Sequence, residues 1–497
     1  MSTHYPCGRS GYHIYDWQRK QRRATAAYTA ALETIRLLLN AIVSEGASFL
    51  TADIKDFYLG TPLEQWEYMR ISLKHIPTDI QLKYNLKAFA HNGYVLMEIR
   101  KGIYGLKQAG KLAQDRLIAH LAQHGYSQCA NTPCLFRHES NGVAFTLVVD
   151  DFLIKYTDKA AANHLLAALR ELYIVKDDFA TTQKYVGITI SHNISRKTIN
   201  MSMPGYVQKA LVRFKRLQIK GANSPILYVP PKYGRYSQEV YPDSDSTPLS
   251  AAQLLELQEI VGVFLFYARA VDPLMITAIN KIGSSQADAT TNVFAQIDRF
   301  IAYASRFPNS SMCIRASDMK LYCHSDASYL SEPNSRSRAG GYLFLGECKP
   351  GDTPNAAIQY FSVIITTVVS SATEAEYAAL FMTGQSAISI RHTLEDLGYP
   401  QGVTNIVCDN KCAVGIANKT LKQKRSKTID MRFHWIRDQV DLKTFGITWL
   451  EGRYNLADFF TKAHPVHHHL SQSKLYAESE PLSNHEAFLA RGCVGIE

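Results

Sequence analysis

The sequence predicts a mixed, α+β type of architecture spread over two to four domains. Its 497 residues exceed the length of one ordinary domain. Residues 47–60 and 143–157 are patterned as strands with acidic residues at or near their ends, and residues 110–125 are patterned as a helix. A segment rich in proline, residues 221–250, then interrupts this pattern, and strands and helices follow again from Lys320.

The second half has the pattern of helices followed by a small mixed sheet. Residues 251–282 and 292–305 are predicted helices that would pack as a small bundle. Ser370 and Ser371 are available as caps for a later helix that ends before Gly398. The elements expected from residue 320 are strands at 320–326, 339–346 and 358–369, a helix at 373–397, a strand at 404–408, a helix at 428–441, a strand at 447–450 and a short helix at 455–462.

Composition narrows the class of protein. Apolar residues make up 46% and charged residues 20%, an ordinary balance for a globular chain. The 54 Lys and Arg exceed the 44 Asp and Glu, and a net charge of +10 favours an anionic partner such as nucleic acid. The nine cysteines are scattered without a CxxC, which argues against a disulfide framework or structural zinc and favours a reducing compartment. With no run near the roughly 18 apolar residues of a membrane span and no signal peptide, secreted, membrane-spanning and fibrous classes are excluded.

Three carboxylates in the first half are predicted to form a metal site. Asp53 ends an apolar strand, and Asp150 and Asp151 interrupt the apolar run 146–154. Burying such a pair is costly unless a cation neutralises it, and a tight turn would expose both at one end of a sheet. Two Mg²⁺ ions about 4 Å apart could there activate a hydroxyl and stabilise a leaving pyrophosphate. A solvated Asp-Asp turn remains the simpler alternative.

Four sequence blocks here resemble the reverse transcriptase of copia-type LTR retrotransposons. They stand in the family's order and rough spacing: Asp53 with Phe57 and Tyr58, Lys-Gly-Ile-Tyr-Gly-Leu-Lys-Gln-Ala-Gly at 101–110, Val-Val-Asp-Asp at 148–151 and Tyr-Val-Gly-Ile at 185–188. The resemblance implies that Asp53, Asp150 and Asp151 are the metal-binding carboxylates of the palm, with Mg²⁺ or Mn²⁺ as the cofactor.

The same resemblance implies roles for three more residues. Tyr58 takes the place of the aromatic that excludes the ribose 2′-hydroxyl, although the residues alone fit a core aromatic nearly as well. Gln108 resembles a residue that lines the nucleotide and template pocket. Lys176 is a candidate for the cation that protonates the departing pyrophosphate, with a surface lysine as the simpler alternative. Val148 replaces an aromatic that packs beside the primer end, which predicts altered primer positioning.

Four further carboxylates occupy corresponding places in the second half. Asp326 and Asp409 end strands, Glu376 lies on the intervening helix, and Asp458 opens the last short helix. Converging on one edge of the sheet, they would hold two Mg²⁺ ions that activate water against a phosphodiester. Glu374 competes with Glu376, but a first-turn acid that favours the helix dipole accounts for it.

This second arrangement resembles ribonuclease H, and in particular the copia-type version. The matching sequences lie at 325–329, 371–377, 409–410 and 457–462, and the family pattern fits Glu376 rather than Glu374. Arg453 stands where many of these enzymes carry a mobile histidine, so catalysis would rest on metals alone. His434 is the nearest substitute, although a packing role is simpler, and the histidines at 467–469 are interpreted as a solvated loop.

Two basic clusters are candidates for contacts with phosphates. The cluster at 19–23 is interpreted as a solvated face, whereas the cluster at 419–427 precedes a predicted helix beside the nuclease edge. Lys424 and Arg425 in that cluster, together with Arg453, are the candidates for binding substrate. Such contacts give affinity without sequence preference, which suits an RNA–DNA hybrid.

Over residues 24–465 the resemblance implies a reverse-transcriptase palm, a helical thumb and connection, and a ribonuclease H-like α/β domain. Implied partners are an RNA template, a DNA primer, an RNA–DNA hybrid and dNTPs, without a membrane. The implied location is intracellular, in cytoplasmic virus-like particles and the nucleus. The expected divisions are 1–23 unassigned, 24–200 palm, 201–317 thumb and connection with a linker at 221–250, 318–465 ribonuclease H, and 466–497 a loose tail.

Residues 1–23 show no match to the basic fingers segment of the family, so most of the fingers are expected to be missing. Since positioning supplies most of the catalysis in phosphoryl transfer, we expect weak polymerase activity beside intact hybrid cleavage. The main alternative is a non-catalytic nucleic-acid-binding remnant, against which all seven carboxylates argue. A DDE-type integrase shares the second fold but lacks the palm block and the fourth carboxylate.

Overall fold

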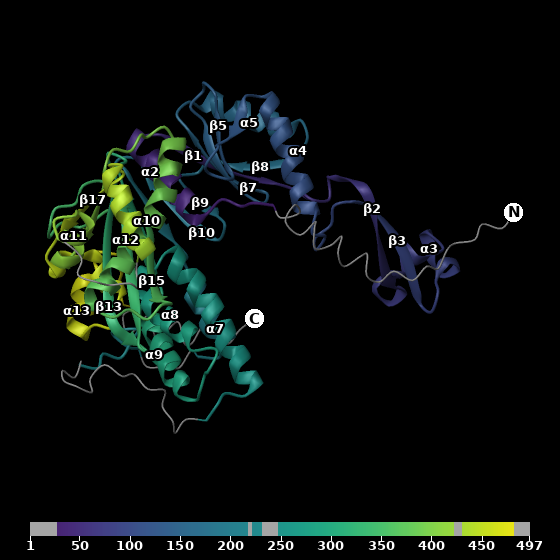
Figure 1. Cartoon of the computed structure of the whole chain (residues 1–497). Helices are drawn as coiled ribbons and strands as arrows, with labels where there is room; N and C mark the ends of the chain where they lie inside the picture. Colours follow the sequence, from purple (N-terminus) through teal and green to yellow (C-terminus); the bar gives the residue numbers. More distant parts are fainter. Residues whose placement is uncertain (1–26, 217–220, 231–246, 422–429, 482–497) are drawn as a thin grey trace. The chain divides into compact units, whose positions relative to one another are not determined.

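The computed structural model describes residues 27–216, 221–230, 247–421 and 430–481. These residues form two compact units (Figure 1). The first contains residues 27–30 and 50–178, and the second contains residues 31–49 and the described residues from 179 onward. Both units combine sheets with helices, so the predicted α+β fold class is confirmed.

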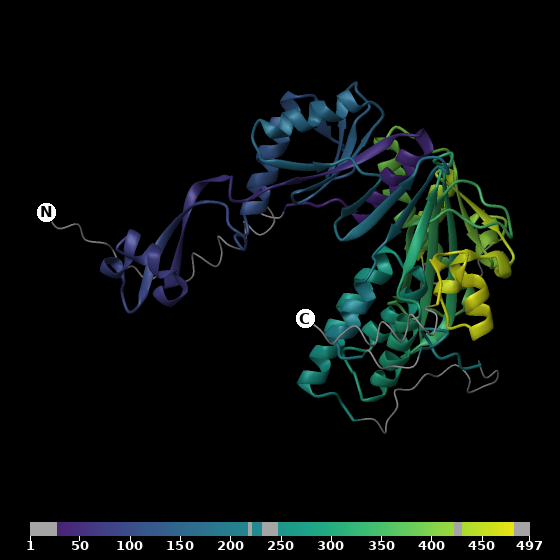
Figure 2. The ribbon, with the colours of Figure 1, turned by 180° about the vertical axis from the view of Figure 1, so that it is seen from behind.

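The first unit is a six-stranded sheet with helices packed on it. Its strand order is β4 (Tyr126–Gln128), β5 (Leu135–His138), β6 (Ala144–Val148), β7 (Asp151–Tyr156), β1 (Ser48–Ile54) and β8 (Val175–Asp178). Helices α4 (Ala109–Gln123) and α5 (Lys159–Arg170) lie side by side over it (Figures 1 and 2). Helix α4 buries Ala113, Leu117 and Leu121, four residues apart, so one face of the helix packs inward.

A long hairpin extends the first unit between β1 and α4. It consists of β2 (Pro62–Ser72) and β3 (Tyr94–Lys101), paired antiparallel, with the short helix α3 (Thr78–Lys83) in its connection. Most of the residues of both strands are exposed, so the hairpin contributes little to the core.

The second unit contains an antiparallel sheet and a group of helices. The sheet order is β18 (Glu478–Ser479), β12 (Ser310–Arg315), β11 (Thr198–Ser202), β10 (Ile188–Asn193) and β9 (Thr182–Tyr185). The helices are α6 (Tyr206–Arg213), α7 (Ala251–Ala270), α8 (Ile276–Ser284) and α9 (Asn292–Arg306). Contacts between α7 and α8 and between α8 and α9 form the bundle expected from residues 251–305, although the helix expected at 251–282 is divided into α7 and α8. Helix α6, which was not predicted, contacts α9.

A mixed five-stranded sheet completes the second unit. Its order is β15 (Ala357–Ile365), β14 (Arg336–Leu345), β13 (Leu321–Glu332), β16 (Thr404–Cys408) and β17 (Phe445–Trp449). The first three strands are antiparallel, and β16 and β17 run parallel to β13. Helix α10 (Ala372–Asp396) packs on this sheet through a cluster that includes Ala339, Ala375 and Ala379. Two short helices, α11 (Lys411–Ala417) and α12 (Asp430–Asp441), precede β17.

Helix α2 (Leu32–Glu45) was not predicted from the sequence. Ten consecutive residues from Thr34 to Val43 are buried, and the helix contacts β11, β12, β15 and α10. Inside the protein, the Arg36 guanidinium donates to the carbonyl oxygens of Ile358 and Ala270, at 2.9 and 3.1 Å. A segment that precedes the palm strand in the chain is therefore part of the core of the second unit.

The observed divisions differ from the expected ones at both ends of the second unit. The first unit ends at Asp178 rather than at residue 200, and thumb, connection and ribonuclease H-like parts form one unit. The expected loose tail contains helix α13 (Val466–Ser473) and strand β18, which pairs with β12. Tyr476 is buried there and donates to the carbonyl oxygen of Leu456 at 2.9 Å. Residues 1–26, most of the linker at 221–250, and residues 482–497 lie outside the described part of the chain.

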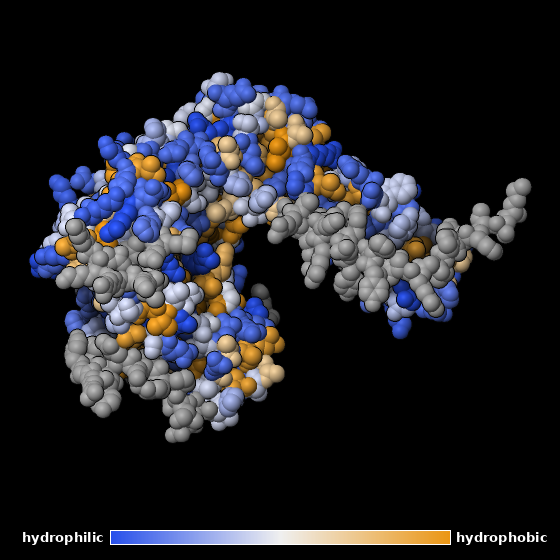
Figure 3. All heavy atoms as spheres, in the orientation of Figure 1, coloured by the Kyte–Doolittle hydropathy of each residue, from blue (hydrophilic) through white to orange (hydrophobic). Residues whose placement is uncertain are grey.

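One helix of the described residues is long and apolar enough to cross a membrane by length and composition, contrary to the sequence-based expectation. This helix is α7, and 33% of its apolar window is buried. Its Tyr267 hydroxyl donates to the carbonyl oxygen of Pro308, and its Val263 carbonyl accepts from Tyr206. Leu255 and Phe266 are exposed, and apolar residues are visible on this part of the surface (Figure 3). A single core helix passes the same test, so α7 alone is weak support for a membrane span.

Candidate active sites

The β6–β7 hairpin places two carboxylates at a strained turn. Val148 and Asp151 form its last pair, so Val149 and Asp150 make a two-residue turn. Val149 has a φ of 62°, a left-handed conformation that a β-branched residue rarely adopts. The Asp150 carbonyl oxygen accepts a hydrogen bond from the Ile54 amide at 3.1 Å, which holds β1 against the turn. Backbone strain that neighbouring strands maintain is typical of functional sites.

Asp53 on β1 joins these two residues in one electrostatic group. Burial raises the pKa of Asp151 to about 6, with the charges of Asp150 and Asp53 adding to the effect. Burial, followed by the Asp53 charge, also raises the pKa of Asp150. Asp53 itself is exposed. The solvated-turn alternative therefore accounts poorly for Asp150 and Asp151, which are half-buried and repel each other.

The structure places the other candidates of the first unit near this group or on its neighbouring elements. Lys176 is exposed and is the direct cross-strand partner of Asp53, so both side chains project from the same face. Burial and then the Asp150 charge raise the pKa of the Tyr58 phenol, whose ring packs edge-on against Tyr104 at 5.3 Å. Gln108 precedes the first residue of α4 and donates to the Glu67 carboxylate on β2 at 2.7 Å.

Parallel pairing brings two of the later carboxylates level with each other. His324 on β13 is paired with Val407 on β16, so Asp326 and Asp409 are each two residues further along. Asp326 is only 4% exposed, while Asp409 is half-buried. The loop after β17 approaches closely, because a Cβ on Gly452 would lie 2.8 Å from the Asp409 Oδ2. Only glycine fits at this position without a shift of the carboxylate.

Glu376 and Glu374 on helix α10 have different surroundings. Glu376 is 7% exposed, accepts a hydrogen bond from the Ala327 backbone, and lies 3.8 Å from the Cys408 thiol through its Oε2. Glu374 instead accepts from the Ser370 amide and hydroxyl, both at 2.6 Å, at the helix N-terminus. Glu376 therefore joins the strand carboxylates, whereas Glu374 satisfies the start of the helix.

Asp458 enters from the short helix η5 (Leu456–Phe460), which packs on β13 and β14. A Cβ on Gly340 of β14 would lie 2.8 Å from the carbonyl oxygen of Ala457, so a glycine is needed for this approach. Lys462 forms an ion pair with Asp458, and the Thr461 hydroxyl donates to Asp326 Oδ2 at 2.6 Å. Thr461 and Lys462 were given no role from the sequence, although both belong to the quoted 457–462 block.

The second cluster holds more negative charge than its surroundings neutralise. Burial, then the charges of Asp458 and Asp409, raise the pKa of Asp326 to about 7. Burial and the charges of Asp326 and Asp409 raise the pKa of Glu376 well above its ordinary value. Burial and then Asp458 raise that of Asp409. All the donors are carboxylate oxygens, so the residues present fit divalent ions of the Mg²⁺ type.

Among the described residues, no hydrogen bond or ion pair joins the remaining candidates, Arg453 and His434, to the carboxylates of the clusters. Arg453 is exposed and forms an ion pair with Glu451 at 2.9 Å, beside Gly452. Lys424 and Arg425 lie outside the described residues, as do the basic residues at 19–23. His434 is exposed on α12.

The solvated-loop interpretation of the histidines at 467–469 is wrong for His469. This residue is 3% exposed, its ring packs against Tyr303 at 5.3 Å and Phe459 at 5.5 Å, and burial lowers its pKa to about 4. Consecutive residues of a helix point in different directions, so a His-His-His run can place one ring in the core.

Comparison with known proteins shows which proteins the chain resembles. Residues 15–228 match the family described as "Reverse transcriptase (RNA-dependent DNA polymerase)". The chain is 24% identical over 437 residues to "Retrovirus-related Pol polyprotein from transposon TNT 1-94" of Nicotiana tabacum, covering 87% of this chain and 31% of that protein. It is 26% identical over 369 residues to "Retrovirus-related Pol polyprotein from transposon RE2" of Arabidopsis thaliana, covering 73% and 24%. The chain thus spans about a quarter to a third of these relatives.

Two solved structures match the chain at low similarity. One is "Structure of the foamy viral protease-reverse transcriptase in complex with RNA/DNA hybrid", with a TM-score of 0.46 and 13% identity over 84% of this chain and 46% of that one. The other is the LC11 ribonuclease H1 from compost, with a TM-score of 0.23 and 16% identity over 29% and 93%.

The class of protein that the family match defines is therefore a reverse transcriptase, over residues 15–228, and the mixed five-stranded sheet follows it in the chain. Within this class, the chain is similar to the Pol polyproteins of plant transposons, which agrees with the resemblance found in the sequence.

Proposed function

We propose that the chain performs two metal-dependent phosphoryl transfers in separate units. The first is RNA-directed DNA synthesis at Asp53, Asp150 and Asp151. The second is cleavage of the RNA strand of an RNA–DNA hybrid at Asp326, Glu376, Asp409 and Asp458. The observation that carries this proposal is that each unit brings carboxylates together. In the first, the turn that holds Asp150 bonds to the Ile54 amide beside Asp53, and in the second, Asp326 and Asp409 lie level along adjacent parallel strands.

Each group would hold two Mg²⁺ ions, with Mn²⁺ as a substitute, which lower the pKa of the attacking hydroxyl or water and neutralise charge on the phosphoryl group. The protein's own contribution in the first unit is positioning. Tyr58, beside Asp150, would exclude a ribose 2′-hydroxyl, and Gln108 would contact the nucleotide and template. Lys176, the cross-strand partner of Asp53, would give a proton to the pyrophosphate that leaves a dNTP.

In the second unit, Thr461 and Lys462 organise the carboxylates. The Thr461 hydroxyl fixes one oxygen of Asp326, so the other oxygen is free to face a metal. Lys462 offsets part of the negative charge at Asp458. Exposed Arg453 would contact a phosphate of the hybrid, and we extend this role to Lys424 and Arg425 on sequence grounds.

Separation of the two activities tests this proposal. In the purified full chain, Asp150→Asn is expected to abolish primer extension on an RNA template with Mg²⁺ while hybrid cleavage stays within about twofold, because its carboxylate belongs to one cluster only. Asp409→Asn is expected to give the reverse. Exposed surface aspartates provide matched controls, Asp115→Asn in the first unit and Asp298→Asn in the second.

Loss of both activities from either single change, with the fold intact by circular dichroism, would contradict two independent sites. Absence of both activities from the wild-type chain with Mg²⁺ and with Mn²⁺, together with retained hybrid binding, would instead favour the non-catalytic remnant.

A further inference from the structure

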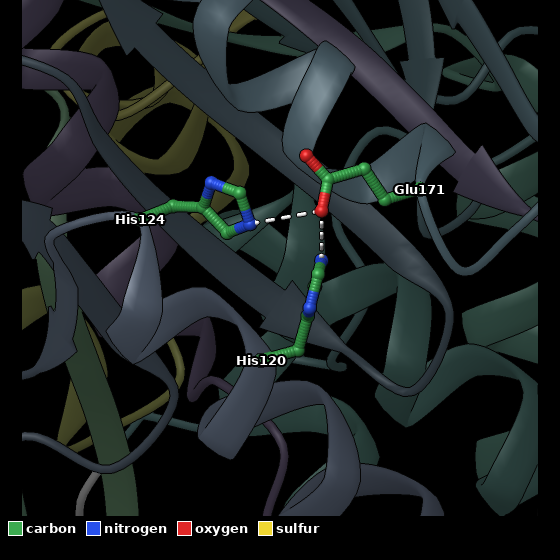
Figure 4. A group of neighbouring side chains, drawn as sticks. All are labelled: His120, His124 and Glu171. Carbon is green, nitrogen blue, oxygen red and sulfur yellow. Dashed lines mark ion pairs between the residues drawn. The ribbon is translucent and has the colours of Figure 1, made fainter.

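Two histidines and a glutamate meet in the first unit, and none of them belongs to the Asp53, Asp150 and Asp151 cluster. His120 and His124 are one turn apart at the C-terminal end of α4, and Glu171 directly follows the last residue of α5. Their side chains point toward one another (Figure 4). Glu171 Oε2 lies 3.2 Å from His124 Nε2 and 3.8 Å from His120 Nε2, and the three atoms are all within 4.8 Å of one another.

The position of this group on its helices favours a bound cation. His124 and Glu171 follow directly after the last residues of α4 and α5, so the C-terminal ends of two helices converge there. The helix dipole makes each such end partially negative. The imidazoles are also held in place: the side chain of His120 is 10% exposed and that of His124 is 22% exposed, while that of Glu171 is 56% exposed and reaches solvent. The site is thus partly preorganised and open to an ion.

We propose that His120, His124 and Glu171 bind one divalent transition-metal ion of the zinc class. Two imidazole nitrogens and one carboxylate oxygen form a common zinc ligand set, and nitrogen donors select against Mg²⁺. At bond lengths of about 2.0–2.2 Å, tetrahedral ligands lie roughly 3.3–3.6 Å apart, close to the two distances found here. Only small side-chain movements are needed to complete the site.

Binding requires one change at His120. Its Nε2 lies 2.7 Å from the carbonyl oxygen of Ala168 on α5, where an N–H donor forms a hydrogen bond. An ion takes the Nε2 lone pair, so the ring proton must move to Nδ1 and the bond to Ala168 is replaced. The contact between His120 and Ala168 already joins α4 to α5. The ion would replace it as a cross-link between the two helices that cover the palm sheet.

Zinc binding to the full chain tests the proposal without any activity assay. Chelator-treated protein is titrated with ZnCl₂ by calorimetry in excess Mg²⁺, which occupies the acidic clusters. The wild-type chain is expected to bind one zinc ion. His124→Ala and Glu171→Gln should each weaken this binding by at least about tenfold, since even the loss of an outer-shell partner costs about 10–100-fold. Co²⁺ in place of zinc should give a visible absorption band that the same variants lose.

Two histidines serve as controls. His164 is a near control, because its ring lies 6.3 Å from that of His124 while its Nδ1 bonds to the Tyr126 hydroxyl. His392, exposed in the second unit, is a distant one. Both His164→Ala and His392→Ala are expected to retain the zinc ion.

Equal zinc affinity in wild-type and His124→Ala proteins, or no zinc binding in excess Mg²⁺, would overturn the proposal and leave a plain histidine–glutamate ion pair. Loss of zinc in His164→Ala but not in His120→Ala would also overturn it, because the ligands would then be different residues. Circular dichroism of each variant separates loss of the ion from loss of the fold.

Discussion

Both carboxylate clusters bring negatively charged side chains close together, but their backbone conformation and their burial differ. The palm cluster places Asp53 in solvent and leaves Asp150 and Asp151 half-buried on a strained turn. The ribonuclease H-like cluster buries Asp326 and Glu376 almost completely, and neither of these two residues has a positive φ. In the palm cluster the backbone turn is strained, but the carboxylates keep part of their contact with solvent. In the ribonuclease H-like cluster the unfavourable free energy comes instead from burying the carboxylates close to one another. We therefore expect the second cluster to depend more strongly on its metal ions for stability.

The largest expected effect separates two glutamates on one helix. Glu376→Gln is expected to reduce hybrid cleavage by more than about 100-fold, because the loss of an outer-shell partner alone costs 10–100-fold. Glu374→Gln keeps an oxygen for the Ser370 hydrogen bonds and should lower stability by only about 0.3–1 kcal/mol through the helix dipole. Initial rates on a hybrid with Mg²⁺ measure the difference. If Glu374→Gln is the inactive variant, then Glu374 rather than Glu376 belongs to the carboxylate cluster.

The second prediction concerns pH and metal-free stability. Because the folded-state pKa of Asp326 is raised to about 7, the folded chain holds a proton that the unfolded chain has lost above about pH 4. Stability without metal should therefore fall as the pH rises from about 4 to 7. At pH 7.5 in chelator, Asp326→Asn is expected to raise the free energy of unfolding by about 1–3 kcal/mol. Denaturant titration measures this gain.

Added Mg²⁺ sharpens the same comparison. It should stabilise the wild-type chain and have a smaller effect on Asp326→Asn, since it binds the folded cluster. Asp272 provides an internal control, because burial raises its pKa to about 7 and its Oδ1 accepts from the Leu274 amide. The pH dependence that Asp272 causes should remain when Mg²⁺ is present. If the free energy of unfolding of the metal-free chain instead rises from pH 4 to 7, the claim that the negative charge of Asp326 is not neutralised in the folded state is wrong.

The sequence predicted the elements around the sites better than the packing between them. Strand 404–408 and the helix after Ser371 were found because apolar periodicity and caps are local signals. Glu376 was separated from Glu374 by the family pattern, and the structure gives the two residues different surroundings. Helix α2 was missed, and so was the burial of Arg36, because its partners are more than 200 residues away in the chain. The His120, His124 and Glu171 group was missed for the same reason, since only the fold brings α5 to α4.

The smallest expected effect tests the strain in the palm turn. Val149→Gly removes the left-handed penalty of about 1–2 kcal/mol but adds about 0.5–1 kcal/mol of backbone entropy cost, so a net gain of about 0–1.5 kcal/mol is expected. Val186, with a φ of 47° between β9 and β10, is the matched control, and Val186→Gly should gain a similar amount. Only Val149→Gly should slow primer extension, because it loosens the turn that holds Asp150 and Asp151. Denaturation and single-nucleotide extension measure the two effects. Unchanged extension in Val149→Gly would mean that the strained turn contributes nothing to positioning the carboxylates, and the contrast between the clusters would then rest on burial alone.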